Sequence, residues 1–329
     1  MTGRETAVAW ALLELNWLPL GAMCAALIAT VSVTRFSIEP VGMASCLAVI
    51  AVYAGLAYYN AKAPHRGDPQ VVFVLGSTAQ LALVIVLMGP LTYVAAGANF
   101  PMQDASLHAL DLALGLDWRA YMAYVNDHPL LAAWLSAGYA MIKWPILAIP
   151  VVLAMTGRYR RLQEFTLAFS LALIITTVVS AMVPAIGVFQ QLGLIAADYP
   201  NLHPRAYLDQ VRDLPLVRDG TMRHLDLFEL TGIVTFPSFH AASAALYAWA
   251  FWPVRWARPV GIAANVLMLA GTPIDGGHYF VDLIGGIAVT ALAIAAARLA
   301  SSTLRRAGEP HSAGTAAAAT DRERVAPAA

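Results

Sequence analysis

FPSFHAASA, at residues 236–244, and GGHYFVD, at residues 276–282, are the two stretches around which the sequence is organised. Each stands at the beginning of an apolar segment, and a further apolar segment between them returns the chain. If these segments are membrane helices, an even number of crossings separates the two stretches, which then lie at the same membrane face. The sequence predicts that His240, His278 and Asp282 converge there.

The composition is that of an integral membrane protein. Of the 329 residues, 59% are hydrophobic and only 12% are charged, whereas an ordinary globular domain carries about 25% charged residues. The mean hydropathy is +0.65. The formal net charge is zero, and the sequence has no basic block of the kind that follows a phosphate backbone. These features predict an all-α polytopic bundle of membrane helices and no nucleic-acid partner.

A membrane-spanning helix needs about 20 apolar residues, and the sequence has about eight candidates. Only Arg4 precedes the first, and no clear small-residue cleavage site follows it, so a retained helix is expected and not a signal peptide. The candidates run over residues 10–33, 41–59, 71–96, 130–155, 165–189, 237–252, 260–274 and 279–299.

The basic residues predict the orientation, because cytoplasmic loops are enriched in lysine and arginine. With eight spans, the basic loops all lie on one side and both termini are cytoplasmic, while the opposite loops are acidic or mixed. The abundant arginine and alanine indicate a GC-rich bacterial genome and hence the bacterial cytoplasmic membrane. The residues that define the inner side are Lys62, Arg66, Arg158, Arg160, Arg161, Arg255, Arg258, Arg298, Arg305 and Arg306.

The predicted spans divide the chain into three parts. Residues 1–70 hold two N-terminal helices, and residues 71–300 form a membrane-embedded core. Residues 307–329 are small, polar and proline-containing, which predicts a disordered cytoplasmic tail. The core has one sizeable outer loop, at about 190–235, without a strong secondary-structure signal. Such a loop is usually functional or disordered, and its position just before FPSFH favours substrate handling.

Residues 100–128 form another outer segment. Apolar residues alternate with charged ones there, which predicts an amphipathic helix in the outer interface, broken near Gly115. Trp118, Tyr121 and Tyr124 are expected to anchor it at the level of the lipid headgroups. The simpler interpretation of this segment is a lid or a spacer without chemistry.

FPSFH is predicted to place His240 in the first turn of a helix. Thr235 can cap this helix, and Pro237 is tolerated in the first turn because its missing N–H would have had no intrahelical partner. The free amides at 238–240 and the positive helix end would face an anion. A histidine there could donate a proton to a leaving oxygen; the alternative is a structural or interfacial histidine.

GGHYFVD is predicted to pair a histidine with a carboxylate. Gly276 and Gly277 allow a tight turn and a close backbone approach, which makes Gly277 a candidate substrate-binding residue. His278 is expected to open the last helix, with Asp282 one turn on along the same face. The carboxylate can hold one ring nitrogen and leave the other free as a nucleophile toward phosphorus. A packing or pore-side pair is the alternative, but ionisable groups in membrane helices are costly and indicate function by default.

FPSFH followed by HYFVD resembles the type 2 phosphatidic acid phosphatase superfamily, whose motifs include Pro-Ser-Gly-His and a later His-x3-Asp. It is most similar to the inositol phosphorylceramide synthase-like branch, strongly over about 218–286 and through the helix pattern over most of the core. The resemblance implies a six-helix core and a phosphohistidine mechanism. By this implication His278 is the nucleophile, Asp282 orients it and His240 protonates the leaving group. Ser238 would contact the phosphate, and no metal or other cofactor would be required.

Two motifs of the superfamily are missing. Lys-x6-Arg-Pro is absent, since the only Arg-Pro, at 258–259, has no lysine at the required spacing and is predicted to lie on the inner side. Gly271-Thr272 replaces the Ser-Arg that precedes the second histidine, and Phe239 replaces the glycine of Pro-Ser-Gly-His. Phosphoryl oxygens still need cationic or amide partners in the transition state, so other residues must supply them.

Arginines of the outer loop are the first candidates for this contact, with solvated surface charge as the alternative for each. Lys143, a costly cation in the middle of the fourth span, could reach the site by snorkelling or pair with a carboxylate such as Asp275. In order of preference, the candidate arginines are Arg218, Arg223, Arg205 and Arg212.

The sequence thus predicts a membrane enzyme that cleaves or transfers the phosphate group of a lipid at the outer membrane face. A phosphatase and a phosphotransferase share the first half-reaction, and they differ in whether water or an alcohol, such as a polyol acceptor, takes the phosphoryl group. The alternative from another class is a transporter or lipid-binding membrane component that uses the histidines as proton relays. Against it, the polar residues gather at one membrane face and do not line a path across it.

Overall fold

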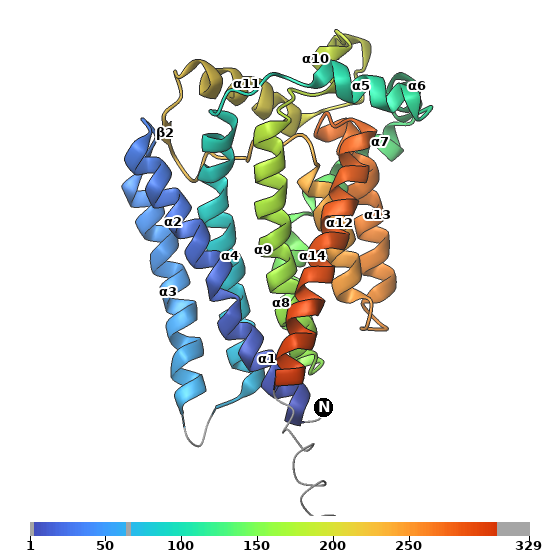
Figure 1. Cartoon of the computed structure of the whole chain (residues 1–329). Helices are drawn as coiled ribbons and strands as arrows, with labels where there is room; N and C mark the ends of the chain where they lie inside the picture. Colours follow the sequence, from blue (N-terminus) through green and yellow to red (C-terminus); the bar gives the residue numbers. More distant parts are fainter. Residues whose placement is uncertain (1–2, 64–66, 308–329) are drawn as a thin grey trace, which may run out of the picture.

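A computed structural model describes residues 3–63 and 67–307. The long helices run side by side as a bundle, and short helices lie across one end of it (Figure 1). Within the described residues there is almost no strand, and five helices are long and apolar enough to cross a membrane, or six if one bent pair counts as a span. The predicted all-α polytopic membrane bundle is confirmed.

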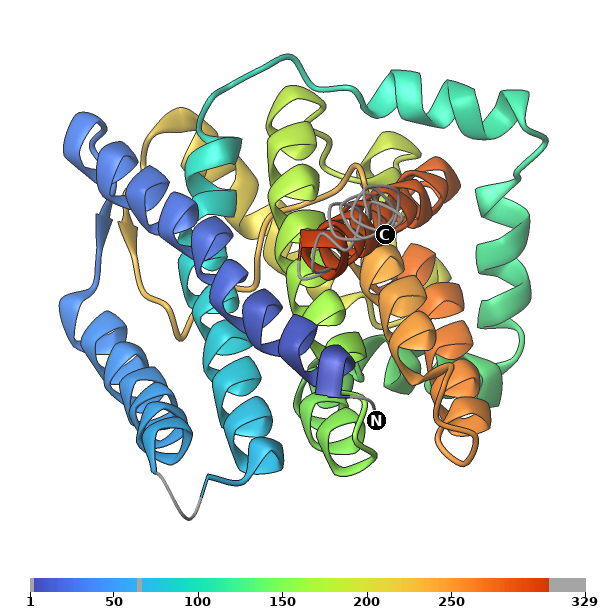
Figure 2. The same cartoon turned by 60° about the horizontal axis from the view of Figure 1, so that its bottom comes forward.

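The N-terminal part comprises α1 (Gly3–Leu15), α2 (Trp17–Val33), α3 (Pro40–Lys62) and α4 (Pro69–Ala96). α1 and α2 together form one apolar segment of 31 residues. Proline stands in the first turn of both α3 and α4, and the preceding carboxylates, of Glu39 and Asp68, accept hydrogen bonds from first-turn amides. α3 packs on α4 and forms one edge of the bundle (Figure 2).

The C-terminal part of the bundle comprises α7 (Pro129–Ala140), α8 (Lys143–Met155), α9 (Tyr159–Met182), α12 (Phe239–Phe251), α13 (Arg258–Asp275) and α14 (Phe280–Ala307). α9 is central, because it packs against α1, α4, α12 and α14. Phe165 and Phe169 of α9 are buried against Tyr247 of α12. In the first turns of α9, Gln163 accepts a hydrogen bond from Asn16 at the α1–α2 junction (3.0 Å). The N-terminal helices are therefore tied to the same core.

The fourth predicted span, 130–155, is broken. α7 and α8 meet at 58°, with Lys143 exposed at the break. Pro145 explains the break, because a continuous helix would need its missing amide to bond the carbonyl of Met141. The position assigned to Lys143 in the middle of a straight helix is therefore wrong.

The sixth and seventh predicted spans are helices, but they do not meet the length and hydropathy of a span. α12 has 13 residues, a length of about 20 Å, whereas the hydrocarbon core is about 30 Å thick. α13 has 18 residues, but it begins with Arg258 and ends with Asp275, and these charges lower its hydropathy. The two helices pack against each other and against the longer helices around them.

The outer layer comprises α5 (Asp104–Ala113), α6 (Trp118–Asn126), α10 (Val188–Gln191), the 3-10 helix η1 (Ala196–Asp198) and α11 (Arg205–Asp219). Two short strands, β1 (Ser37–Ile38) and β2 (His224–Leu225), pair in parallel. The expectation that 190–235 lacks strong secondary structure is wrong, since α11 alone has 15 residues. α11 is amphipathic, and it buries Tyr207, Leu214 and Val217 on one face.

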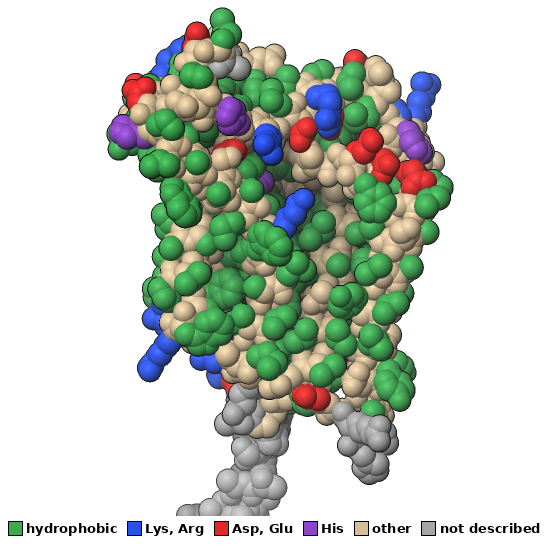
Figure 3. Space-filling model, turned by 180° about the vertical axis from the view of Figure 1, so that it is seen from behind, with side chains coloured by type: hydrophobic (Ala, Val, Ile, Leu, Met, Phe, Trp, Pro, Cys, Tyr) green, Lys and Arg blue, Asp and Glu red, His purple; other side chains and the backbone are tan. Residues whose placement is uncertain are grey.

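The surface is consistent with a membrane environment. Figure 3 shows hydrophobic side chains over most of one face, with most charged side chains toward its two ends. The end with α5, α6 and α11 lies opposite the end where α1 begins and α14 finishes (Figure 1). The predicted disordered tail falls on residues 308–329, which lie outside the described residues.

Candidate active site

Ser238 is the N-cap of α12. Its Oγ accepts a hydrogen bond from the amide of Ala241 (3.3 Å), and its side chain is fully buried. The prediction that Thr235 caps this helix is wrong. Thr235 instead donates its hydroxyl to the carbonyl of Ala185 (2.6 Å), because the chain stays extended through Pro237 and enters the helix only at Phe239.

His278 and Asp282 form the predicted pair. Nδ1 of His278 lies 3.0 Å from Oδ2 of Asp282, and the same oxygen accepts the amide of Tyr279 (2.9 Å). Both side chains are buried. α14 begins at Phe280, so His278 precedes the helix and does not open it. Asp282, in the first turn, reaches back to the histidine.

The two stretches meet at Ser238. Its Oγ lies 3.3 Å from Nε2 of His278, and its amide donates to the carbonyl of Asp282 (2.9 Å). The close approach requires Gly286 of α14, because a Cβ there would collide with the carbonyl oxygen of Ser238. The hydrogen bonds fix the beginnings of α12 and α14 against each other.

His240 lies in the first turn of α12, within electrostatic range of His278. Its ring stacks on Tyr139 of α7, with centroids 3.9 Å apart and planes at 9°. The two histidines therefore lie near each other, although no described hydrogen bond joins His240 to His278 or Ser238. These three residues and Asp282 are called the histidine cluster. Their catalytic roles stay predictions.

The arrangement leaves Nε2 of His278 without a carboxylate partner among the described residues. In the tautomer with the proton on Nδ1, the hydrogen bond to Asp282 fixes the ring and leaves the lone pair on Nε2. Nε2 faces Ser238 and the start of α12, where the amides of Phe239 and His240 make no hydrogen bond with any described residue. Free amides at a helix N-terminus bind anions. The site can therefore present a nucleophile and anion-binding donors to one phosphate group.

Two aspartates of α5 hold the loop that carries His278. Asp111 accepts the amides of Val281 and Phe280, the first residues of α14 (2.8 and 2.9 Å). Asp104 accepts the hydroxyl of Tyr279 (2.9 Å) and the amide of Gly187 (2.9 Å). The interpretation of residues 100–128 as a lid or spacer missed both. The available signal was their spacing of seven residues, which puts two carboxylates on one face of a helix.

Burial shapes the ionisation of this supporting layer. It raises the pKa of the Asp111 carboxyl, and the hydrogen bonds from the amides of Phe280 and Val281 oppose the shift. It also raises the pKa of the Tyr279 hydroxyl, to which the neighbouring Asp104 carboxylate adds. Tyr279 therefore remains a neutral donor to Asp104 across the physiological range.

Residues 100–128 form two helices, with the predicted break near Gly115. Trp118 is not a headgroup anchor, because it is 2% exposed and donates its indole N–H to the carbonyl of His278 (3.2 Å). Tyr121 is partly buried and donates to the carbonyl of Ala270 (2.6 Å), whereas Tyr124 is exposed. Only Tyr124 keeps the exposure expected of an anchor.

Gly277 adopts φ +64°, in the left-handed region, and a Cβ there would lie 2.6 Å from Cδ2 of Tyr207. Its carbonyl accepts the amide of Val188 (2.9 Å). The glycine thus lets the His278 loop pass under α11 and contact α10.

The arginines proposed to contact phosphate differ in their engagement. Arg218 donates to the carbonyl of Phe100 (2.9 Å), and Arg223 donates to the carbonyls of Val217 and Met222. Arg212 pairs with Asp209 and Asp213. The side chain of Arg205, the first residue of α11, is exposed and forms no hydrogen bond or ion pair with any described residue. No described contact joins Arg218 or Arg223 to the histidines.

A cavity of about 190 Å³ lies between α7, residues 201–203 and the end of α13. Asp275 lines it. Oδ1 of Asp275 accepts a hydrogen bond from Ser136 (2.9 Å), while Oδ2 is buried and has no partner among the described residues. Arg205 lies within electrostatic range of this carboxylate. Lys143 forms no ion pair with it, so the suggested Lys143–Asp275 pair is not formed.

Comparison with known proteins gives one match. A family model described as the PAP2 superfamily matches residues 105–296, a range that runs from α5 into α14 and contains every residue of the histidine cluster. No curated protein and no solved structure matches the chain.

Proposed function

Since the chain belongs to the PAP2 superfamily, we propose that this phosphatase-type lipid enzyme acts through a phosphohistidine intermediate on His278. The observation that carries the proposal is the position of His278, whose Nδ1 is held by Asp282 while Nε2 faces Ser238 and the free amides of α12. The substrate is a lipid phosphate drawn from the surrounding membrane lipids.

In the first half-reaction, Nε2 of His278 attacks phosphorus and the bond from phosphorus to the lipid oxygen breaks. The electron pair leaves with that oxygen, and His240 gives it a proton. Asp282 stabilises the positive charge on the phosphorylated imidazole. In the second half-reaction, His240 takes a proton from the acceptor, whose oxygen attacks phosphorus and frees His278. Ser238 and the amides of Phe239 and His240 bind the phosphoryl oxygens.

Arg205 is the arginine best suited to replace the missing cationic motifs. Backbone carbonyls or carboxylates already bind the side chains of Arg218, Arg223 and Arg212. The side chain of Arg205 has no such partner in the described part of the chain and lies within electrostatic range of Asp275. Asp275 precedes His278 by three residues. A guanidinium binds phosphate through two parallel hydrogen bonds. Arg218 and Arg223, the first choices from sequence, act in this account by holding the outer layer, and Gly277 by shaping the His278 loop.

The Asp275 cavity supports an alcohol as the acceptor. Its unpaired carboxylate oxygen would repel a phosphate but accept a hydrogen bond from a hydroxyl group, and Ser136, Asn201 and His203 line the same space. A hydroxyl both donates and accepts, so a polyol acceptor fits this mixed lining. The resemblance of GGHYFVD to the inositol phosphorylceramide synthase-like branch points the same way.

The bundle is placed in the membrane with the histidines at the outer face and both termini in the cytoplasm. The support is the arginine distribution: Arg158, Arg160, Arg161, Arg298 and Arg305 surround one pocket at the end of the bundle opposite the histidines. By the positive-inside rule this end is cytoplasmic. Residues 71–300 form the catalytic core in this account, and residues 1–70 are an addition that packs on α4 and α9.

Phosphorus NMR of the purified protein tests the function. A panel of lipid phosphates is incubated with and without inositol or glycerol, and His278→Ala serves as the control. Free phosphate that disappears in the variant identifies a lipid phosphatase, and a phosphodiester that forms only with the polyol identifies a transferase. Equal turnover by wild type and variant contradicts the proposal.

A further inference from the structure

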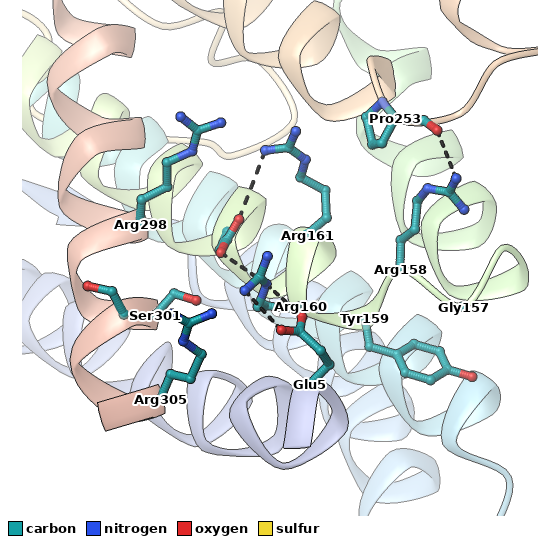
Figure 4. A pocket seen from close by; sticks show the side chains of 12 residues that line it. Glu5, Gly157, Arg158, Tyr159, Arg160, Arg161, Pro253, Arg298, Ser301 and Arg305 are labelled. Carbon is teal, nitrogen blue, oxygen red and sulfur yellow. Dashed lines mark hydrogen bonds and ion pairs between the residues drawn. The ribbon is translucent and has the colours of Figure 1, made fainter. Parts of the chain in front are cut away.

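A second polar pocket lies at the end of the bundle opposite the histidines. Its volume is about 570 Å³, and it is lined by residues of α1, α9 and α14, the turn before α9, and Pro253 from the turn after α12. Figure 4 shows arginines from α9 and α14 directed toward a common space. The described mechanism uses none of these side chains.

The pocket carries an excess of positive charge. Five arginines line it against two glutamates, which leaves three positive charges uncompensated within the lining. The arginines are Arg158, Arg160, Arg161, Arg298 and Arg305, and the glutamates are Glu5 and Glu164.

Both glutamates contact the same arginine, Arg160. Arg160 contacts Glu5 through two nitrogens (3.0 and 3.2 Å) and Glu164 at 3.5 Å. Glu164 lies 4.0 Å from Arg161, the outer limit of an ion pair. Arg158 donates to backbone carbonyls (2.8 and 3.1 Å). Among the described residues, Arg158, Arg298 and Arg305 have no carboxylate within 4.0 Å, so theirs are the three uncompensated charges.

Trp249 brings two of the five guanidinium groups together. The guanidinium carbon of Arg161 lies 3.8 Å from the centroid of the Trp249 ring, and that of Arg298 lies 5.6 Å from the same centroid. Two like charges held on one ring repel each other unless an anion lies between or beside them. The side chain of Arg161 is 19% exposed, so water screens this repulsion only partly.

We propose that this pocket, defined by Arg161, Arg298 and Arg305, binds a phosphate group at the membrane face opposite the active site. A guanidinium presents a planar fork that matches phosphate oxygens, and Ser302 at the rim adds a hydroxyl. Basic pockets between membrane helices bind anionic lipid headgroups. The phosphate comes either from such a headgroup or from solution.

A cytoplasmic excess of arginine alone does not account for this arrangement. Arg255 and Arg258 lie at the same end, and Arg258 stacks on Trp252 with its Nε–H bonded to the carbonyl of the same residue. Arg258 therefore stacks on an indole ring as Arg161 does. It does not line this pocket, and it does not belong to the group of arginines there. It supplies the matched comparison.

The test measures ligand binding to the full-length protein in a neutral detergent by isothermal titration calorimetry. The ligands are inorganic phosphate, dioctanoylphosphatidylglycerol and dioctanoylphosphatidylcholine. Arg161→Gln/Arg298→Gln is compared with Arg255→Gln/Arg258→Gln, which removes the same charge at the same end. The expected result is a dissociation constant for the anionic ligand raised at least about tenfold in the first variant and unchanged in the second.

Arg305→Gln is a further variant, because Arg305 is exposed and its substitution leaves the helix contacts in place. A several-fold weaker affinity is expected, and it is measurable even if the double variant does not fold. Tight binding of the phosphatidylglycerol but not of inorganic phosphate supports a lipid headgroup, and the reverse supports a soluble anion. Equal weakening in both double variants, or no preference for either anion over phosphatidylcholine, overturns the proposal. These readouts do not depend on turnover at His278.

Discussion

At the scale of single residues, the account depends on a division of roles between two histidines. In the proposed reaction, His278 makes the bond to phosphorus, whereas His240 only moves a proton. Loss of a nucleophile removes the reaction path, while loss of a general acid costs about 10²- to 10⁴-fold and matters little when the leaving group needs no proton.

The first prediction separates these roles with two leaving groups. His278→Ala abolishes phosphate release from both a lipid phosphate and an aryl phosphate such as p-nitrophenyl phosphate. His240→Ala strongly reduces release from the lipid phosphate and spares loading from the aryl phosphate, because nitrophenolate leaves without protonation. Single-turnover kinetics measure both. An equal loss for both substrates in His240→Ala would contradict the assignment.

A second prediction concerns the cation that binds phosphate. Arg205→Ala lowers kcat/KM by about 10²-fold or more, the usual effect of removing a donor to transition-state charge. Arg205→Lys restores part of it. Arg218→Ala mainly lowers the thermal stability, since Arg218 holds the carbonyl of Phe100. Steady-state kinetics and thermal unfolding are measured on all three variants. If Arg218→Ala lowers kcat/KM more than Arg205→Ala does, Arg218 and not Arg205 is the cation that binds phosphate.

Sequence spacing was sufficient to predict the positions of some site residues and not of others. The His278–Asp282 pair follows from a separation of four residues, which brings the two side chains together even though the helix begins only at Phe280. Thr235 was a plausible cap by residue type, but Ser238 took the position. Asp104 and Asp111 resembled the solvated side of an interfacial helix, and only the tertiary fold shows that this side is buried.

At the scale of elements, α5 holds the beginning of α14. The amides of Phe280 and Val281, the first residues of α14, have no intrahelical partner and donate to Asp111. His278 lies only two residues before Phe280. The position of His278, the proposed nucleophile, therefore depends on a carboxylate from another helix.

A third prediction follows from this contact. Asp111→Asn loses about 1–3 kcal/mol of local stability, because one of the two amides then faces an N–H₂ group and stays unsatisfied. The melting temperature and the turnover both fall. Asp127→Asn is the control, since Asp127 is exposed in the same outer layer. Equal melting temperatures for the two variants would contradict the supporting role of Asp111.

The limits of the predicted helices show where local chemistry overrides hydropathy. The third predicted span, 71–96, matches α4 within two residues. The fifth was extended to 189, whereas α9 ends at Met182, because Pro184 disfavours helix at the residue before it. α11 was missed because its sequence is polar, and its apolar face is buried only against the rest of the fold.

At the scale of the whole molecule, the account assigns opposite membrane faces to the histidines and to the arginine pocket. A fourth prediction tests this orientation by labelling intact cells with a membrane-impermeant maleimide. In a Cys24→Ala/Cys46→Ala background, Asp127→Cys is labelled directly, and Arg255→Cys only after permeabilisation. The reverse pattern would place the active site in the cytoplasm.

The phosphohistidine is the central claim, and its direct detection is the most decisive measurement. Protein mixed rapidly with a radiolabelled lipid phosphate is quenched in base and digested, and the labelled peptide is identified by mass spectrometry. The account predicts an acid-labile, base-stable phosphate on His278 that forms at least as fast as product and is absent in His278→Ala. Turnover without this intermediate, or a label on another residue, would contradict it.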